Sequence, residues 1–177
     1  MKATGIVRRI DDLGRVVIPK EIRRTMRIRE GDPLEIYTNA GGEVIFKKYS
    51  PIGELSVFAT QYAEVMGAAT KLPIIICDRD RCIAAAGISK KEALERKVTP
   101  ELETIINERK SVNIENEKLS ALEGIDRGIT VASPIIAAGD VCGAVVLLQS
   151  ETGEKANDSD MKLVSVAAAF LGRQVES

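Results

Sequence analysis

Basic side chains are concentrated in one short segment near the start of the chain. Residues 2–29 hold nine lysines or arginines against three acids, a net charge of +6 in a 177-residue chain whose formal net charge is −1. Most of the nine are arginines, whose planar guanidinium groups pair with phosphates and with guanine edges. Such a concentration is typical of a phosphate-binding surface, so the sequence predicts nucleic-acid binding rather than a merely solvated face.

Short β-branched runs would hold these side chains on ordered backbone. Residues 4–10 and 15–18 are predicted to be strands, joined by a turn over 11–14. In that turn Gly14 can take a positive φ, and the preceding aspartates can accept hydrogen bonds from nearby backbone N–H groups. Two further strands over 34–38 and 43–49 would form a hairpin.

A short helix is predicted over residues 19–26. Pro19 suits the first turn of a helix because its missing N–H has no partner there. Helical spacing places Ile22 and Met26 on the inner side and Arg23 and Arg24 on the outer side.

Two motifs make the interpretation of this segment specific. They are D-x-x-G-R-V-V-I-P-x-x-x-R-R over residues 11–24 and G-D-x-L-E over residues 31–35. The segment from residue 2 to about residue 50 resembles the AbrB family of bacterial transition-state regulators, which are similar in fold to MazE-type antitoxins. The resemblance implies a mostly-β, DNA-binding barrel in which two chains interleave swapped hairpins. Arg27 stands where the family pattern often has glycine, which puts the usual left-handed helix ending in doubt.

The resemblance also ranks the basic residues. Matching family positions imply that double-stranded DNA is contacted mainly by Arg8, Arg15, Arg23 and Arg24. Residues of second rank, nearer to electrostatic steering, are Lys2, Arg9, Lys20 and Arg27.

Size and strand edges independently favour a dimer. About fifty residues with four short strands and one short helix bury too little surface to be stable alone. A single chain would also leave strand edges open.

Charge divides the chain into two parts. Residues 1–50 carry a net charge of +4 and residues 51–177 a net charge of −5. We therefore predict a DNA-binding domain over 1–50, a connector helix over 51–71 beginning at Ser50-Pro51, and a second domain over 72–177.

The second domain has the element order of an α+β fold. Two pairs of strands, over 73–77 and 82–86 and over 129–136 and 141–149, are separated by helices opened by a capping box at Ser89 and by Thr99-Pro100, and a last helix capped at Asn157 follows them. The run S-P-I-I-A-A-G-D-V-C-G-A-V-V-L-L over 133–148 resembles a GAF domain. The resemblance implies an antiparallel sheet with flanking helices, in a family of small-molecule sensing and dimerisation modules.

The last helix carries two apolar stripes and therefore needs two packing partners. One stripe is assigned to a neighbouring subunit, and its packing would make a homotetramer from two DNA-binding dimers. This stripe comprises Met161, Val164, Ala168, Leu171 and Val175. The other, assigned to the domain's own sheet, comprises Leu163, Val166 and Phe170. Periodicity alone leaves open the reverse assignment.

The residue inventory argues against an enzyme. The chain has no histidine, so a triad using histidine is impossible. Its three cysteines form no C-x-x-C pair and are expected to be reduced core thiols. No metal site or cofactor is predicted. An unidentified small molecule remains a further candidate partner, in a pocket expected between the sheet and the helices and expected to be aliphatic. No apolar run reaches about 18 residues, so the protein is expected to be cytoplasmic, without a membrane partner.

These observations predict a sequence-selective transcription regulator, acting as activator, repressor or both. The resemblance of the two halves together implies a role in bacterial spore development. The alternative is an antitoxin-like protein whose C-terminal half binds a partner protein. Antitoxins usually place a disordered tail after this fold, whereas here a patterned domain follows.

Overall fold

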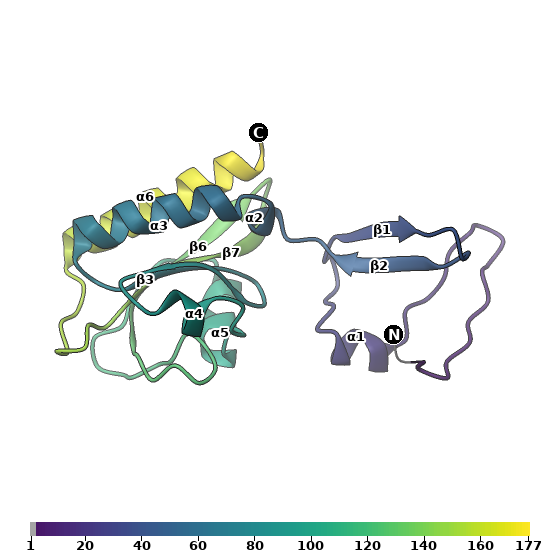
Figure 1. Ribbon diagram of the computed structural model, residues 1–177, viewed down its shortest axis with the longest axis horizontal. Helices are drawn as coiled ribbons and strands as arrows, with labels where there is room; N and C mark the ends of the chain where they lie inside the picture. Colours follow the sequence, from purple (N-terminus) through teal and green to yellow (C-terminus); the bar gives the residue numbers. More distant parts are fainter. Residues whose placement is uncertain (1–2) are drawn as a thin grey trace. The chain divides into compact units, whose positions relative to one another are not determined.

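The computed structural model describes residues 3–177 and divides into two compact units, Met1–Tyr49 and Ser50–Ser177 (Figure 1). Among the described residues, none of the helices has both the length and the apolar composition of a membrane span.

The first unit consists of a short helix and a hairpin. Helix α1 (Lys20–Thr25) is followed by strands β1 (Leu34–Thr38) and β2 (Val44–Lys48), which pair antiparallel. The hairpin turn is held by Asn39, whose side-chain oxygen accepts the N–H groups of Gly41 and Glu43 at 3.0 and 3.1 Å. Within residues 3–49, Pro19 is the one residue classed as buried, so a single copy of this unit has almost no core.

The strands predicted over 4–10 and 15–18 are not formed in the single chain. The turn between them is present: the N–H of Gly14 donates to the carbonyl of Asp11 at 3.1 Å, and Gly14 has a φ of +77°. A β-branched run becomes a strand only when a neighbouring strand supplies hydrogen bonds. Within residues 3–177 of a single chain, neither run is paired with a strand.

Helix α1 ends in the left-handed conformation that the sequence put in doubt. Arg27 has a φ of +52°, and the N–H of Ile28 reaches back to the carbonyl of Arg23 at 2.8 Å. This is the bonding of a glycine-type helix end, made here by an arginine. Met26, predicted to face inward, is instead 58% exposed because it lies at the C-cap, beyond the last helical residue.

The second unit is a five-stranded antiparallel sheet between two helical layers. The strands, in the order β4-β3-β7-β6-β5, are β3 (Ile74–Asp78), β4 (Cys82–Ala86), β5 (Val112–Asn113), β6 (Ile129–Ala137) and β7 (Asp140–Leu148). One face carries α2 (Pro51–Glu54), α3 (Ser56–Thr70) and α6 (Asp158–Val175); the other carries α4 (Lys90–Ala93) and α5 (Pro100–Glu108) (Figure 1).

Alternation along the strands fills two aliphatic cores. In β3, Ile74 and Ile76 face the α3/α6 layer, whereas Ile75 and Cys77 face the α4/α5 layer. All four side chains are fully buried. The face under α4 and α5 is therefore occupied by the protein's own apolar side chains.

The helix starts follow the predicted capping residues with one exception. Ser50 accepts the N–H of Gly53 at 3.0 Å, and Asn157 forms a capping box with Asp160. Ser89, predicted to open a capping box, makes no side-chain cap on α4. The helix predicted over 51–71 is broken at Leu55 into α2 and α3.

The two stripes of α6 are reversed relative to the sequence assignment. Val164, Ala168 and Leu171 are at most 1% exposed and pack in the core against the domain's own sheet, with Met161 and Val175 at its margin. The exposed stripe is Leu163, Val166 and Phe170. α6 also runs very close to β6: a Cβ placed on Gly172 would lie 2.2 Å from the carbonyl oxygen of Ile136.

Candidate nucleic-acid interface

The predicted DNA-contacting side chains all lie on the first unit. Arg8, Arg9, Arg15, Lys20, Arg23 and Arg24 belong to exposed residues. Arg27 is half-buried, and Lys2 lies outside the described residues. The segment 3–18 and helix α1 therefore present a basic, solvent-accessible surface, which we call the basic surface.

Arg15 is held by the turn that precedes it. The Asp11 side chain accepts the N–H of Leu13 at 3.0 Å and the N–H of Arg15 at 2.8 Å through Oδ1. Its second oxygen, Oδ2, accepts the Nε–H of the Arg15 guanidinium at 2.8 Å. The hydrogen bonds from the Arg15 backbone and side chain lower the pKa of Asp11. Sequence reasoning identified Asp11 as a turn residue and missed this second contact.

Arg23 is held in a comparable way on α1. Its Nε–H donates to the carbonyl of Ile18 at 3.2 Å. The Nε–H of Arg23 is thus used in a contact with the protein's own backbone, on a residue that is exposed as a whole.

Other basic residues of the unit serve its fold. Asp32 accepts the N–H of Arg29 at 2.8 Å, and its carboxylate lies 3.9 Å from the Arg29 guanidinium and 3.8 Å from Lys48. The ammonium of Lys48 also donates to the carbonyl of Arg27 at 2.7 Å. These contacts tie β2 to the end of α1 below the basic surface.

The first unit exposes many large apolar side chains. Those with more than a third of their surface exposed are Ile6, Val7, Ile10, Leu13, Val16, Val17, Met26, Ile36, Tyr37, Val44, Phe46 and Tyr49. So dense a set is unusual for a free surface, because scattered single residues are the norm there.

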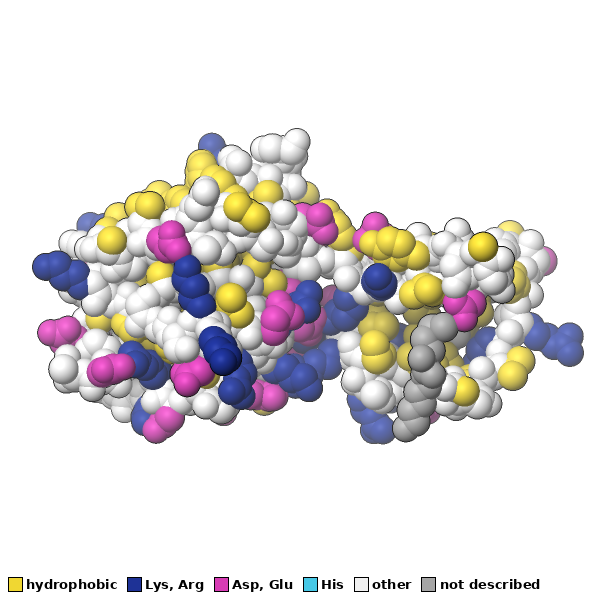
Figure 2. Space-filling model, in the orientation of Figure 1, with side chains coloured by type: hydrophobic (Ala, Val, Ile, Leu, Met, Phe, Trp, Pro, Cys, Tyr) yellow, Lys and Arg dark blue, Asp and Glu magenta, His cyan; other side chains and the backbone are white. Residues whose placement is uncertain are grey.

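A second exposed apolar surface lies on α3 and α6, and we call it the α3/α6 face. Its centre is three aromatic rings, Phe58, Tyr62 and Phe170, with centroids 5.7 to 6.1 Å apart. Figure 2 shows apolar side chains along the two helices. Other exposed apolar residues of α3 and α6 are Val57, Val65, Leu163 and Val166.

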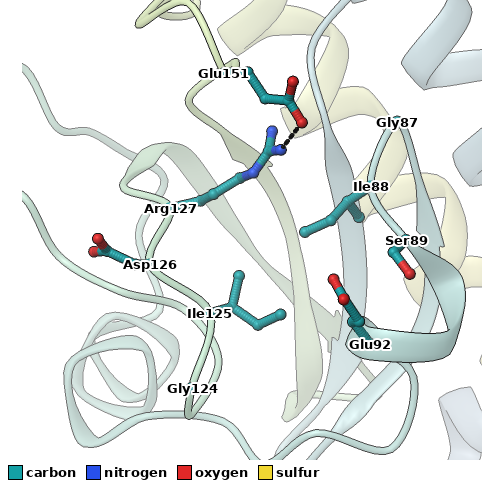
Figure 3. A pocket seen from close by; sticks show the side chains of 9 residues that line it. All are labelled: Gly87, Ile88, Ser89, Glu92, Gly124, Ile125, Asp126, Arg127 and Glu151. Atoms are coloured by element: carbon teal, nitrogen blue, oxygen red, sulfur yellow. Dashed lines mark hydrogen bonds and ion pairs between the residues drawn. The ribbon is translucent and has the colours of Figure 1, made fainter.

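A pocket of about 620 Å³ opens at the end of the sheet of the second unit (Figure 3). Ile88 and Ile125 lie between two polar sides, with Glu92 and Ser89 on one and Arg127 and Glu151 on the other. The Arg127 guanidinium and the Glu151 carboxylate are 2.7 Å apart. This pocket differs from the aliphatic one predicted between the sheet and the helices, because loops bring charged side chains to its walls.

The cysteines are core thiols. Cys77 and Cys82 are fully buried and opposite each other on β3 and β4. The hydrogen bond with Cys82, together with burial, raises the pKa of Cys77 well above its ordinary value. Among residues 3–177, no cluster of three or more histidine, cysteine or acidic side chains is arranged to hold a metal ion.

Comparison with solved structures identifies the fold of the second unit. The GAF domain of an Acinetobacter phosphoenolpyruvate-protein phosphotransferase superposes with a TM-score of 0.53 at 11% identity, covering 68% of this chain and 81% of that one. The GAF domain of Thermosynechococcus elongatus PixJ superposes with a TM-score of 0.54 at 10% identity, covering 73% and 89%. Such identities establish a GAF fold and nothing about a ligand.

Sequence comparison covers both units. Residues 7–53 match the family described as the MazE antitoxin, and residues 54–176 match the family described as the stage V sporulation protein T C-terminal transcription factor. Over 51 residues the chain is 61% identical to the transition state regulatory protein AbrB of Bacillus subtilis, which covers 29% of this chain and 52% of that protein.

One relative extends over the whole chain. The stage V sporulation protein T of Bacillus subtilis is 50% identical over 179 residues, covering 99% of both chains. An AbrB-like unit thus precedes a GAF unit in one continuous match, and the chain belongs to the stage V sporulation protein T family.

Proposed function

We propose that the protein is a sequence-selective DNA-binding transcription regulator that acts in bacterial spore development. The observation that carries the proposal is the basic surface on a segment with the D-x-x-G-R-V-V-I-P motif, in a chain that matches a sporulation protein along its full length. A regulator of this kind would act in the cytoplasm and needs no catalytic residue, cofactor or metal.

Arg8, Arg15, Arg23 and Arg24 are the proposed principal DNA contacts. All four are exposed, and α1 carries two of them side by side. Lys2, Arg9, Lys20 and Arg27 would contribute mainly long-range attraction, which salt screens.

The first unit is proposed to act as an interleaved homodimer. A single copy buries almost nothing, and its segments 3–18 have strand-forming residues without strand partners. A second copy would cover the exposed apolar side chains and complete the ladders, as a swapped-hairpin barrel requires.

The α3/α6 face is proposed to join two such dimers into a homotetramer. Its aromatic centre and aliphatic border are suited to packing against the same face of a second copy, with a two-fold axis between them. Linking two DNA-binding dimers raises avidity through effective concentration without adding a contact. The pocket lined by Glu92, Arg127 and Glu151 would bind a small polar ligand, and this binding would regulate the assembly.

Charge-matched variants test the DNA-binding proposal. We expect Arg23→Ala/Arg24→Ala to weaken binding of the full-length protein to a duplex selected by the parent from a random 30-base-pair library. The control, Lys91→Ala/Lys162→Ala, removes the same charge from exposed positions of the second unit. An equal loss of DNA affinity in both variants would mean that only net charge matters, and would contradict the assignment of DNA binding to the basic surface.

The antitoxin alternative rests on the MazE family match of residues 7–53. An antitoxin would co-purify with a partner polypeptide, whereas the regulator should purify alone as an oligomer. The folded second unit favours the regulator, because antitoxins of this fold usually carry a disordered tail.

A further inference from the structure

Asp11 is an acidic residue in the middle of the basic surface. It lies four residues before Arg15, and electrostatics alone would favour its absence from a surface that binds a polyanion. Its two carboxylate oxygens have different tasks: Oδ1 binds the backbone N–H of Arg15, and Oδ2 binds the Nε–H of the same residue. Asp11 therefore fixes the Arg15 side chain relative to its own backbone.

The atom that Asp11 binds determines what Arg15 can still do. A guanidinium has five N–H donors, one on Nε and four on the two terminal nitrogens. With Nε used by Asp11, the end formed by the two terminal nitrogens remains available. That end matches the O6 and N7 acceptors of guanine in the major groove.

The ion pair is too exposed to serve mainly as a stabilising contact. The Arg15 side chain is 71% exposed and that of Asp11 is 37% exposed, and such surface pairs contribute little to folding. A long side chain fixed before binding loses less conformational entropy when it reaches DNA. The contact is thus better explained by binding than by folding.

We propose that Asp11 is a specificity-determining positioning residue, which holds the Arg15 guanidinium end-on for reading a base edge. The inference rests on the proposed DNA-binding function and adds an acidic residue to its machinery. It also predicts that removing a negative charge from the DNA-binding surface impairs sequence discrimination, which simple electrostatics would not predict. Removing the carboxylate makes the surface more positive and should preserve or tighten binding to arbitrary DNA, while discrimination between sequences should fall.

Asp11→Asn separates the two tasks of the carboxylate. The amide oxygen can still accept the turn N–H groups of Leu13 and Arg15, but the amide nitrogen cannot accept the Nε–H of Arg15. Asp12→Asn is the matched control because it removes the same charge one residue away. Among the described residues, no ion pair joins Asp12 to an arginine.

The test measures a ratio of affinities. Full-length parent, D11N, D12N, R15A and D11N/R15A are titrated against the duplex selected by the parent and against a shuffled duplex of equal composition. We expect D11N to lower the selected-to-shuffled affinity ratio about tenfold or more, with affinity for the shuffled duplex unchanged or higher. D12N should keep the parental ratio, and D11N should have no effect in the R15A background.

Three results would overturn the proposal: an unchanged ratio in D11N, an equal fall in D11N and D12N, or a fall that persists without Arg15. Circular dichroism and solution mass establish that each variant remains folded. If D11N does not fold, Asp11→Ser replaces it, since its hydroxyl can still accept a turn N–H. A parent that selects no sequence would instead refute the proposed function, and this inference with it.

Discussion

Replacing Gly172 by alanine should destabilise the second unit, although alanine is the better helix former. Gly172 lies in α6, where a Cβ would be 2.2 Å from the carbonyl oxygen of Ile136 and 3.1 Å from its carbonyl carbon. Non-bonded heavy atoms pack at about 3.5 Å, so α6 or β6 must move by about 1 Å. That movement would disturb the buried layer of Val164, Ala168 and Leu171.

The expected net effect follows from two opposing terms. Replacing glycine by alanine inside a helix stabilises it by about 1 kcal/mol. Overpacking against backbone costs about 1–3 kcal/mol, and occasionally more, and a contact this short belongs at the upper end. We therefore expect Gly172→Ala to lower the free energy of unfolding by about 2 kcal/mol, or the Tm by roughly 6–10 °C.

Gly67→Ala in α3 is the matched control. Its Cβ would meet the Ala86 Cβ at 3.3 Å, a tight contact that a shift of a few tenths of an ångström relieves, and the Ile74 Cγ2 at 3.5 Å, an ordinary contact. This variant should be neutral or slightly stabilising. Urea unfolding followed by far-ultraviolet circular dichroism, at one fixed protein concentration, measures both. A Gly172→Ala protein as stable as the parent would refute the close packing of α6 on β6.

Three other predictions concern assembly, DNA contact and the thiols. Phe170→Glu should leave the second unit folded and reduce the solution mass from that of a tetramer to that of a dimer, whereas Leu171→Glu buries a charge and should unfold the unit. Light scattering measures the mass and circular dichroism the folding, and a tetrameric Phe170→Glu protein would contradict the proposed assembly. If the Arg24 side chain contacts one phosphate, Arg24→Ala should reduce the magnitude of the slope of log affinity against log salt concentration by about 1. Fluorescence anisotropy at several salt concentrations measures this slope, and an unchanged slope would contradict a phosphate contact by Arg24. Cys77, fully buried and with a raised pKa, should react with a thiol reagent at pH 8 only after unfolding; prompt modification in the native protein, located by mass spectrometry, would contradict its burial.

The strands of the second unit could be predicted well from the sequence. Its apolar runs are long and bounded by turn residues, so local pattern and tertiary environment agree. β4 was predicted with the observed bounds, and β6 and β7 within one residue. The exposed positions of Arg23 and Arg24 also followed from spacing along a short helix.

The orientation of α6 could not be predicted in the same way. Both of its stripes are apolar, and periodicity gives the angle between them but not which one faces the sheet. The buried side of α6 includes the small residues Ala167, Ala168 and Gly172, and Gly172 permits the close approach to Ile136.

The first unit shows a limit of a different kind. Its β-branched runs over 4–10 and 15–18 predict strands that the single chain does not form, because a strand ladder needs a partner strand. The contact between Asp11 and Arg15 could not be predicted either, because a D-D-L-G turn explains both aspartates without it.

The left-handed arginine at the end of α1 has a consequence for engineering the protein. A side chain at a positive φ costs about 1–2 kcal/mol relative to glycine, so Arg27→Gly is among the first substitutions that a search for heat resistance would find. The same change deletes a positive charge next to the basic surface. Selection for thermal stability alone would therefore enrich variants that are more stable but bind DNA more weakly. Thermal stability and DNA affinity need to be screened together.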